Sequence, residues 1–455
     1  MMVKRAGWLL VFWFVASWPL RAQQSLLPLS SVVRRVVARD PGVLARQAEF
    51  KAAQTETRRA ESKRLPKLNL TTGTGVGKSV DDLANVLLTG LVPVAVTNPR
   101  TRSRLASLSL SRPYVIPGAS LEDDLYDGGE TAATIETARL KADKSRVGQG
   151  RARQDAAYQA ALYFLRLAQG QILQRDLEEY AQIAHRAARA LSAQAKVGKV
   201  TPAEALAGIS QYEAAEASLG NDRDGLRLWS QLLRRLGGFA VDTAFDTRAL
   251  ERYLAAYPLS PLPSSMDISK TRAVQDANLE ARIAAQQLRS ARAARLPHVS
   301  FLAEYGFQFS NLLFTFRPGY NVGVEVSYPL FTGGRRSRDI VAGEEHLTAA
   351  RFEARKAREE QDAKYEEMAE EDRTLGRELT AAKSELAEAS EIYRVARLKY
   401  DQGIESPSDL LEAAGLWLKS RNRCLTLAQS SLLLRWAALR SQGQLVSSLE
   451  QGVLP

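Results

Sequence analysis

The chain has 455 residues, of which 45% are hydrophobic and 25% are charged, and its formal net charge is +11. This length allows two or more domains or one elongated unit, and this composition excludes a wholly disordered chain. The basic residues are spread among acidic ones instead of forming one stripe, which argues against a nucleic-acid-binding protein.

The N-terminus has the pattern of a secretory signal. Lys4 and Arg5 precede GWLLVFWFVASW, an apolar run of about a dozen residues that is too short to span a bilayer. Ala22 then supplies a small residue at the cleavage position, so residues 1–22 are predicted to be removed and the mature protein to begin near Gln23. No later run approaches the roughly 20 apolar residues of a membrane helix, so entry into a membrane would require strands.

The mature sequence contains two similar halves. RLPKLNL at 64–70 recurs as RLPHVSF at 295–301, LYDGG at 125–129 as LFTGG at 330–334, and KVGKVTPAEAL at 196–206 as DQGIESPSDLL at 401–411. The second and third pairs share an offset of 205 residues (333 − 128 and 403 − 198), whereas the first has an offset of 231 (295 − 64). The first half therefore carries 26 extra residues (231 − 205), which we expect within 79–104 or partly in IPGASLEDD.

These repeats define the predicted domains. After the signal come a first repeat, a connector, a second repeat and a C-terminal tail, at 23–236, 237–265, 266–445 and 446–455. Each repeat has the same order: a helix, strands, a Gly-Gly pair, a long helix, a Gly-x-x-x-Pro turn and a second long helix. Pro66 and Pro297 mark the change from helix to strand, because proline disfavours the helical conformation in the residue before it.

The predicted strands of the second repeat alternate apolar and polar residues. Two sets of apolar residues each share one face: Phe301, Ala303, Tyr305, Phe307 and Phe309, and then Val322, Val324, Val326 and Tyr328. The wall of a membrane barrel and an ordinary half-buried hairpin both show this period of two.

The predicted helices are unusually long and carry heptad spacing, which is typical of coiled coils. The heptad positions are Leu173, Leu177, Tyr180, Ala184, Ala187 and Leu191 in the first repeat, and Leu375, Leu379, Ala382, Leu386, Ala389, Tyr393, Ala396 and Tyr400 before the second turn, with Leu411, Leu418, Leu425, Leu432 and Leu439 after it. A cytosolic coiled-coil scaffold would show the same heptads, but it would lack the signal and the aromatic strands.

Two strand pairs give four strands in each chain, too few to close a membrane barrel. An open sheet cannot lie in lipid because its edge groups would be unpaired there, and barrels begin at about eight strands. The sequence therefore predicts an oligomeric barrel that is continued by coiled-coil helices.

In their order and duplication, the RLP strand starts, YPLFTGG and KYDQGIESPSDLLEA resemble the outer-membrane efflux protein family, the TolC-like channels. The resemblance covers essentially the whole mature chain. It implies a mainly α fold with β-structure, in which three chains of four strands each form a 12-stranded outer-membrane barrel and their helices form a tunnel across the periplasm. It also implies partners: a periplasmic adaptor protein and an inner-membrane efflux pump, with outer-membrane lipid around the barrel.

The function implied is a passive export duct in the bacterial outer membrane, without enzymatic activity, cofactor or metal. The channel of a type I protein secretion system would have the same fold, and a coiled-coil envelope scaffold without a pore is a further alternative. His185, His298 and His346 are scattered without metal-ligand spacing or a partner carboxylate. The single cysteine, Cys424, cannot form an intramolecular disulfide and is expected to be packed in a helix.

The resemblance also assigns roles to residues at the two turns. Adaptor contact is expected at Gly198, Pro202, Ala205, Leu206, Gly403, Pro407, Leu410 and Leu411, and a pore gate at Tyr400, Asp409, Glu412 and Glu204. Glu405 stands where the best-known member has an arginine that helps to lock the gate, so the lock must differ here or be weaker. A plain helix-turn-helix with a solvated acidic face would have the same residue types.

Overall fold

The structure is a computed structural model that describes residues 27–77, 112–240, 245–246, 248–256, 261–263, 266–310 and 315–451. The predicted signal at 1–22 and the segment at 79–104 lie outside these residues.

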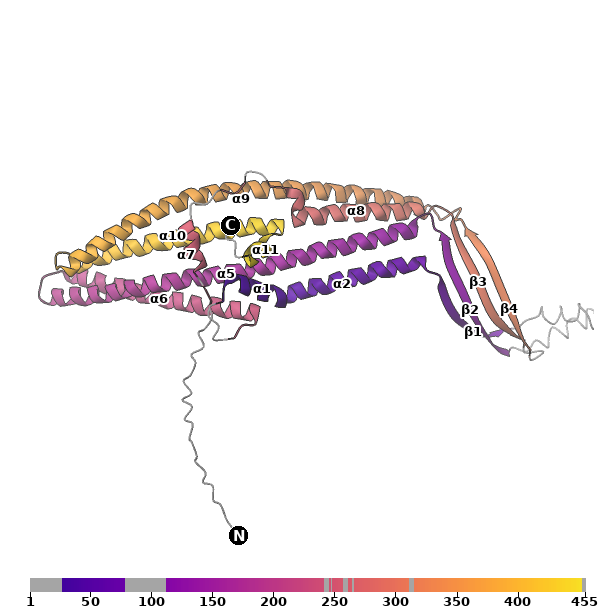
Figure 1. Ribbon diagram of the computed structural model, residues 1–455, viewed down its shortest axis with the longest axis horizontal. Helices are drawn as coiled ribbons and strands as arrows, with labels where there is room; N and C mark the ends of the chain where they lie inside the picture. The colour runs from indigo at the N-terminus through magenta and orange to yellow at the C-terminus, as the bar shows by residue number, and fades with distance from the viewer. Residues whose placement is uncertain are drawn as a thin grey trace, which may run out of the picture. The chain divides into compact units, whose positions relative to one another are not determined.

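The two repeats share the succession of a helix, two strands, a 67-residue helix and a 36-residue helix (Figure 1). The first contains α1 (Leu29–Arg39), α2 (Pro41–Glu61), η1 (Ser62–Arg64), β1 (Lys67–Gly77), β2 (Arg112–Tyr126), α5 (Glu130–Lys196) and α6 (Pro202–Gly237). After α7 (Ala249–Ala256), the second contains η2 (Ile268–Lys270), α8 (Arg272–Ala293), β3 (His298–Ser310), β4 (Thr315–Ser327), α9 (Arg335–Asp401), α10 (Pro407–Gln442) and α11 (Leu445–Glu450).

The long helices confirm the predicted two-fold repeat. Helices α5 and α9 each have 67 residues, and α6 and α10 each have 36. At about 1.5 Å per residue, α5 and α9 are each on the order of 100 Å long. Within the described ranges, no helix is both long and apolar enough to cross a membrane.

The four strands form one antiparallel sheet in the order β1-β2-β3-β4. The apolar residues of β3 and β4 meet on one face, as predicted, in the pairs Phe301–Val324, Ala303–Val322 and Tyr305–Tyr320. Strands β1 and β2 continue this face, with Leu68 opposite Leu121 and Leu70 opposite Ala119. The apolar face therefore extends across all four strands.

This apolar face is uncovered in the single chain. The side chain of Leu70 is 89% exposed and that of Tyr320 is 83% exposed. Strands β1 and β4 are also the edges of the sheet, so each has one row of backbone groups without a strand partner. Among the residues that the structure describes, the sheet thus lacks a cover for one face and a neighbour for each edge.

The chain divides into two compact units, and neither unit coincides with a repeat. One unit comprises residues 1–44, 152–266 and 365–455, and the other comprises residues 45–151 and 267–364. Each compact unit contains segments of both repeats. The repeats are therefore similar in sequence without being separate domains. The sheet and the parts of the helices next to it belong to the second unit.

The core of the first unit lies where the connector meets the long helices. Phe164 and Leu165 of α5 and Trp436 of α10 are fully buried there, together with Leu250 and Tyr253 of the connector. The Tyr253 hydroxyl is hydrogen-bonded to the Ser431 hydroxyl at 2.9 Å. Described residues of the connector, among them Leu250 and Tyr253, are therefore part of the packed core.

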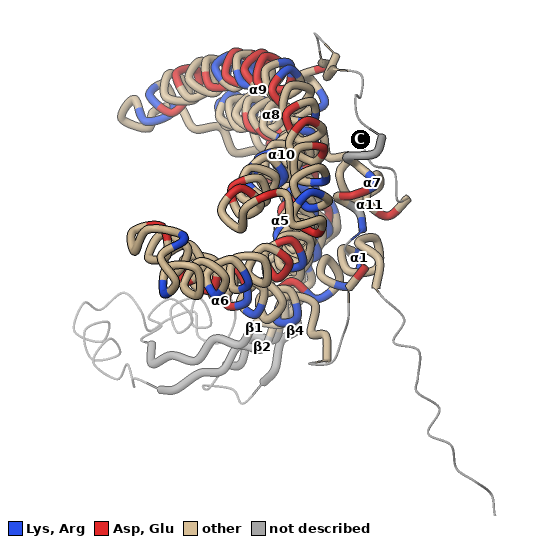
Figure 2. Tube along the Cα trace, turned by 90° about the vertical axis from the view of Figure 1, so that its left-hand side faces the viewer, with Lys and Arg blue, Asp and Glu red and all other residues tan. Residues whose placement is uncertain are grey.

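The predicted heptads are confirmed as packing positions. Most of these side chains are buried, among them Leu177, Ala184 and Leu191 in α5, Leu379, Ala382, Ala389, Tyr393 and Ala396 in α9, and Leu411, Leu425 and Leu432 in α10. Charged residues of both signs are interspersed on the remaining surface, as Figure 2 shows for α9. Cys424 is also buried, and burial raises the pKa of its thiol.

One buried ion pair joins α9, α10 and the connector. The Arg435 guanidinium donates to both carboxylate oxygens of Asp372, with N–O distances of 3.0 and 3.1 Å. The same carboxylate accepts a hydrogen bond from the Leu262 backbone N–H at 2.9 Å. Removing one partner of such a pair typically costs about 3–5 kcal/mol because the other charge is left buried and unpaired.

A second, half-buried carboxylate, that of Asp222 in α6, has no such compensation. It lies against Gly170 of α5, and its Oδ2 atom has no hydrogen-bond partner among the described residues. Burial raises the pKa of Asp222 from its ordinary value of 3.8 to about 6. The folded state therefore favours the protonated acid, and stability falls as the pH rises from about 4 through 6.

We predict that Asp222→Asn raises the thermal unfolding midpoint at about pH 7.5, because it removes a charge that folding desolvates. At about pH 3 the acid is protonated in both the folded and the unfolded state, so the variant and wild type should unfold at similar temperatures. Asp224→Asn, at an exposed acid that pairs with Arg227, is the control. An equal stabilisation at both pH values would contradict this account of Asp222.

Candidate functional site

The candidate site is formed by the two turns that join α5 to α6 and α9 to α10. Gly198 (φ 72°) and Gly403 (φ 75°) adopt the left-handed conformation that ends each long helix. The next N–H group then bonds back to the last turn, from Lys199 to the Gln194 carbonyl and from Ile404 to the Lys399 carbonyl, both at 2.9 Å. A glycine is needed at these positions because other residues resist a positive φ.

Both second helices begin with a side-chain cap. In α6, the Glu204 N–H donates to the Thr201 hydroxyl, and the Thr201 N–H donates to the Glu204 carboxylate at 2.7 Å, which completes a capping box. In α10, the Asp409 N–H donates to the Ser406 hydroxyl, and this hydroxyl donates to the Asp409 carboxylate at 2.7 Å. Pro202 and Pro407 occupy the first helical positions.

The caps give two of the four predicted gate residues a local structural role. Glu204 and Asp409 stabilise helix starts, and an acid in the first turn also interacts favourably with the helix dipole. These two positions therefore favour an acid even without a pore. Glu412 is exposed and makes no ion pair among the described residues, so no local contact accounts for it.

The predicted adaptor residues differ in exposure between the two turns. Gly198, Pro202 and Gly403 are exposed, and the side chain of Leu206 is 66% exposed. The remaining four are buried within the chain: Ala205, Pro407, Leu410 and Leu411. Leu410 and Leu411 of α10 pack against α5 and α9, because they join a core cluster with Ala184, Ala187 and Ala396.

Two exposed apolar residues at the turns were missed by the sequence reasoning. Val197 precedes the first turn glycine and Ile404 follows the second, and the side chain of Ile404 is 71% exposed. Their signal in the sequence is an aliphatic residue beside a helix-ending glycine, where heptad packing has already stopped.

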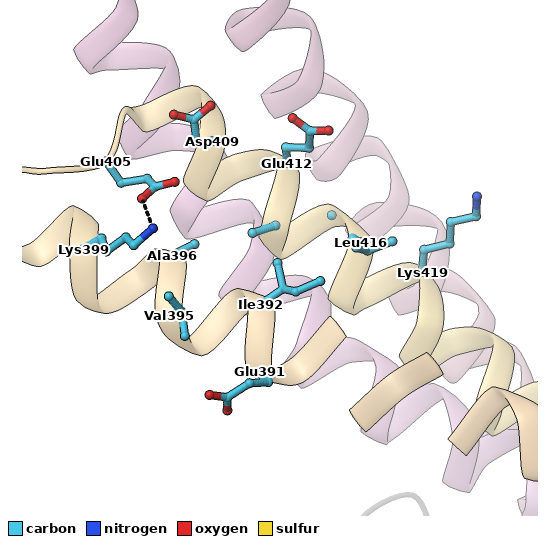
Figure 3. A pocket seen from close by; sticks show the side chains of 12 residues that line it. Glu391, Ile392, Val395, Ala396, Lys399, Glu405, Asp409, Glu412, Leu416 and Lys419 are labelled. Carbon is cyan, nitrogen blue, oxygen red and sulfur yellow. Dashed lines mark ion pairs between the residues drawn. The ribbon is translucent and has the colours of Figure 1, made fainter. Parts of the chain in front are cut away.

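An open groove of about 700 Å³ lies between the end of α9 and the start of α10 (Figure 3). Its lining includes four acids, Glu391, Glu405, Asp409 and Glu412, and two lysines, Lys399 and Lys419. The structure thus brings Asp409 and Glu412 together, as predicted from their spacing of three residues on one helix face. With four carboxylates against two ammonium groups, the lining is acidic.

Glu405 has a partner inside the same chain. Its carboxylate lies 3.4 Å from the Lys399 ammonium group, and the dashed line in Figure 3 marks this ion pair. The pair connects the last turn of α9 to the residue before the Ser406 cap. A carboxylate at this position is therefore compatible with an ionic contact across the turn.

Tyr400 is not part of this groove. Its half-buried side chain lines a smaller cavity with Ile183 and Ala187 of α5 and with Pro407 and Leu410. Within one chain, the structure separates the predicted gate tyrosine from Asp409 and Glu412.

A polar network holds α5 against α9 near this cavity. The Tyr393 hydroxyl donates to the Glu179 carboxylate at 2.8 Å, and Arg397 donates to the same oxygen at 3.0 Å. Burial and the neighbouring Glu179 charge raise the pKa of Tyr393 to about 12, so this tyrosine stays a hydrogen-bond donor. Among the residues that the structure describes, no three His, Cys, Asp or Glu side chains are arranged to hold a metal ion.

Comparison with known proteins relates the second repeat to a protein family and the whole chain to a known fold. Residues 265–442 match the outer membrane efflux protein family. No curated protein sequence matches the chain.

Solved structures of outer membrane proteins share the fold over most of the chain. The outer membrane protein VceC of Vibrio cholerae has a TM-score of 0.71 and 18% identity, covering 91% of this chain and 96% of its own. The CmeC outer membrane channel of Campylobacter jejuni has a TM-score of 0.71 and 16% identity, with coverages of 92% and 86%. The MtrE outer membrane channel of Neisseria gonorrhoeae, in its open state, has a TM-score of 0.65 and 14% identity, with coverages of 93% and 89%. The second repeat therefore matches the outer membrane efflux protein family, and the chain shares the fold of these outer membrane proteins along about nine-tenths of its length.

Proposed function

We propose that the protein is the passive, trimeric outer-membrane duct of a tripartite efflux system. In this assembly it joins a periplasmic adaptor and an inner-membrane pump, and its long helices form a tunnel across the periplasm. The observation that carries the proposal is the apolar face that extends, uncovered, across the whole four-stranded sheet.

A trimer would satisfy both needs of this sheet. Pairing of β4 in one chain with β1 in the next would complete the backbone hydrogen bonds of both edge strands, and three chains would close a 12-stranded barrel. The apolar face would then turn outward to lipid, and the opposite face, with Asn69, Ser120, Glu304 and Asn321 in one row, would line the interior. The similar CmeC and MtrE structures are outer membrane channels, which supports this arrangement.

Two alternative functions are distinguished by different observations. A type I protein secretion channel would use the same fold, so only the cargo distinguishes it. Export of a small fluorescent substrate rather than a polypeptide, by cells that lack their own channel, would favour efflux. A coiled-coil envelope scaffold would explain the helices but leave the apolar face of the sheet unused.

The assembly is tested by measuring the mass and the conductance of the mature protein. In detergent the protein should be a trimer, because fewer copies leave edge strands unpaired. Inserted into a planar bilayer, it should give discrete single-channel currents. A monomer, or a trimer without conductance, would exclude the duct.

We also propose that the acidic groove between α9 and α10 contributes to the gate. In a trimer, three copies of Asp409 and Glu412 near the axis would form a ring of six carboxylates that attracts cations. The Lys399–Glu405 pair would act within each chain to hold the turn, in place of the arginine-based lock implied by the resemblance. Glu412 is the stronger candidate because Asp409 also caps α10.

The gate proposal predicts that Asp409→Asn/Glu412→Gln reduces cation selectivity severalfold in a planar bilayer, because the ring loses its charge. These isosteric changes keep an acceptor for the Ser406 hydroxyl, so the cap is preserved. Glu378→Gln/Glu388→Gln removes two exposed charges from α9 outside the groove and serves as the matched control. Unchanged selectivity in the first variant would place Asp409 and Glu412 on a solvated outer wall.

For the adaptor, we propose contact through the exposed residues of the turns. Leu206, Ile404 and Val197 offer apolar side chains, and the glycines Gly198 and Gly403 allow close approach of a partner. The buried residues Ala205, Pro407, Leu410 and Leu411 would support this surface from beneath.

Leu206→Asp should therefore abolish export while leaving the trimer and its conductance intact, since an exposed side chain contributes little to folding. Leu228→Asp, at an exposed position further along the same helix, is the control and should export normally once its trimer is verified. Normal export by Leu206→Asp would remove the first turn from the partner surface.

A further inference from the structure

Two groups of basic side chains flank the edge strands of the sheet at the end where the helices begin. The β1 pair, Lys63 and Arg64, forms the end of η1, directly before β1. The β4 trio, Arg335, Arg336 and Arg338, forms the first turn of α9, directly after β4 and the Gly-Gly motif. Four of the five side chains are exposed, and Arg336 is half-buried.

The β4 trio is not explained by the stability of its own helix. The first turn of α9 contains no acid, and positive charge at a helix N-terminus is unfavourable. At the positions 205 residues earlier, where α5 begins, the first repeat has Glu130, Thr131 and Ala133. The two copies of this helix start therefore differ by four units of charge, because one Glu corresponds to one Arg and two neutral residues correspond to two further Arg.

Nor do neighbouring acids neutralise these cations. Among the described residues, no ion pair joins the β1 pair or the β4 trio to a carboxylate. Glu61 is paired with Arg139 at 2.8 Å, and Glu344 is paired with Arg292 at 2.7 Å. Asp339, the acid nearest to the trio in sequence, is exposed and makes no ion pair with it.

Exposed apolar side chains stand beside both groups. Leu65 follows the β1 pair, and Leu330 and Phe331 precede the β4 trio with 88% and 89% of their side chains exposed. A soluble anion would gain nothing from these residues. Apolar and aromatic side chains next to arginine and lysine are typical of a membrane interface, where acyl chains and headgroups meet.

The order of the strands would bring the two groups together at the junction between neighbouring chains, here called the seam. Strands β1 and β4 are the opposite edges of one chain's sheet, and they would become neighbours when β4 of one chain pairs with β1 of the next. This step rests on the trimer proposed above. Each of the three seams would then gather five positive charges beside exposed apolar side chains, at the level where the sheet ends.

We infer that the β1 pair of one chain and the β4 trio of the next form a binding surface for anionic phospholipids of the periplasmic leaflet. The lipid phosphate would be held by the guanidinium groups, which match phosphate geometry with paired N–H donors. Its acyl chains would contact Leu330, Phe331 and the apolar face of the sheet. Bound lipid would also relieve repulsion among the five cations and so strengthen the seam.

The test is native mass spectrometry of the detergent-solubilised trimer with phosphatidylglycerol and with phosphatidylcholine of the same acyl chains. The trimer should retain phosphatidylglycerol preferentially. Each basic residue near an anionic surface strengthens binding by about fivefold. Arg335→Gln/Arg336→Gln/Arg338→Gln should therefore weaken phosphatidylglycerol binding by at least about tenfold and leave phosphatidylcholine binding unchanged.

The matched control is Arg351→Gln/Arg355→Gln/Arg358→Gln, which removes three exposed arginines from the same helix. These lie at least 13 residues beyond the trio (351 − 338), about 20 Å along the helix, and should leave lipid binding unaltered. Lys63→Gln/Arg64→Gln, at the other edge of the sheet, should also weaken binding, and it tests the seam independently if the triple variant fails to assemble.

Three results would overturn the inference. Equal loss in the trio variant and in its control would show attraction to overall charge, without a site. An unchanged preference for phosphatidylglycerol in both the trio and the pair variants would exclude these residues. Equal thermal stabilisation of the trimer by inorganic phosphate would assign the surface to a free anion. If the wild-type protein is not a trimer, the duct itself is wrong; a conducting trimer without lipid preference contradicts only the lipid surface.

Discussion

The sheet with one apolar face and two open edges is the constraint on which the rest of the structure depends. Burying apolar surface is worth roughly 25 cal/mol per Å², so a face that leaves Leu70 and Tyr320 largely exposed is costly in water. The helices do not share this requirement, because their backbone groups are paired internally and their heptad positions are buried within the chain. The sheet therefore decides the surroundings that the chain needs.

The sequence was sufficient for those parts of the fold that follow from local periodicity. The two repeats, the shared apolar face of β3 and β4, the buried heptads and the glycine-ended helices were all predictable, because period and turn chemistry depend on neighbours in the chain. Which helix a buried face meets was not predictable in this way. Tyr400 turns toward α5 while Asp409 and Glu412 line a groove beside α9, and only the packing of four helices separates them.

At the candidate site, residue spacing alone did not predict the role of each side chain. An acid three residues after Thr201 or Ser406 belongs equally to a gate motif and to a helix cap, and the hydrogen bonds show the cap. Likewise, Leu206 and Leu411 are equivalent in sequence, yet one is exposed and the other is in the core. The connector was predicted only as a linker, whereas Tyr253 and the Leu262 N–H, which reaches the buried Asp372–Arg435 pair, tie it to the long helices. Such contacts have no periodic signal.

The equal lengths of the paired helices have a consequence for how a duplicated gene of this kind can diverge. Deleting one residue from α5 would turn everything beyond it by about 100° and draw its turn back by about 1.5 Å, while the turn after α9 stayed in place. The side chains shared by α5, α6, α9 and α10 near the two turns would then lose register. A change in the length of one long helix therefore requires the same change in the corresponding helix of the other copy. The 26 residues (231 − 205) by which the copies differ in length all fall between the start of the first strand and the Gly-Gly motif. Substitutions can therefore make the two copies differ in sequence, whereas a length change in a helix of one copy alone would disrupt their packing.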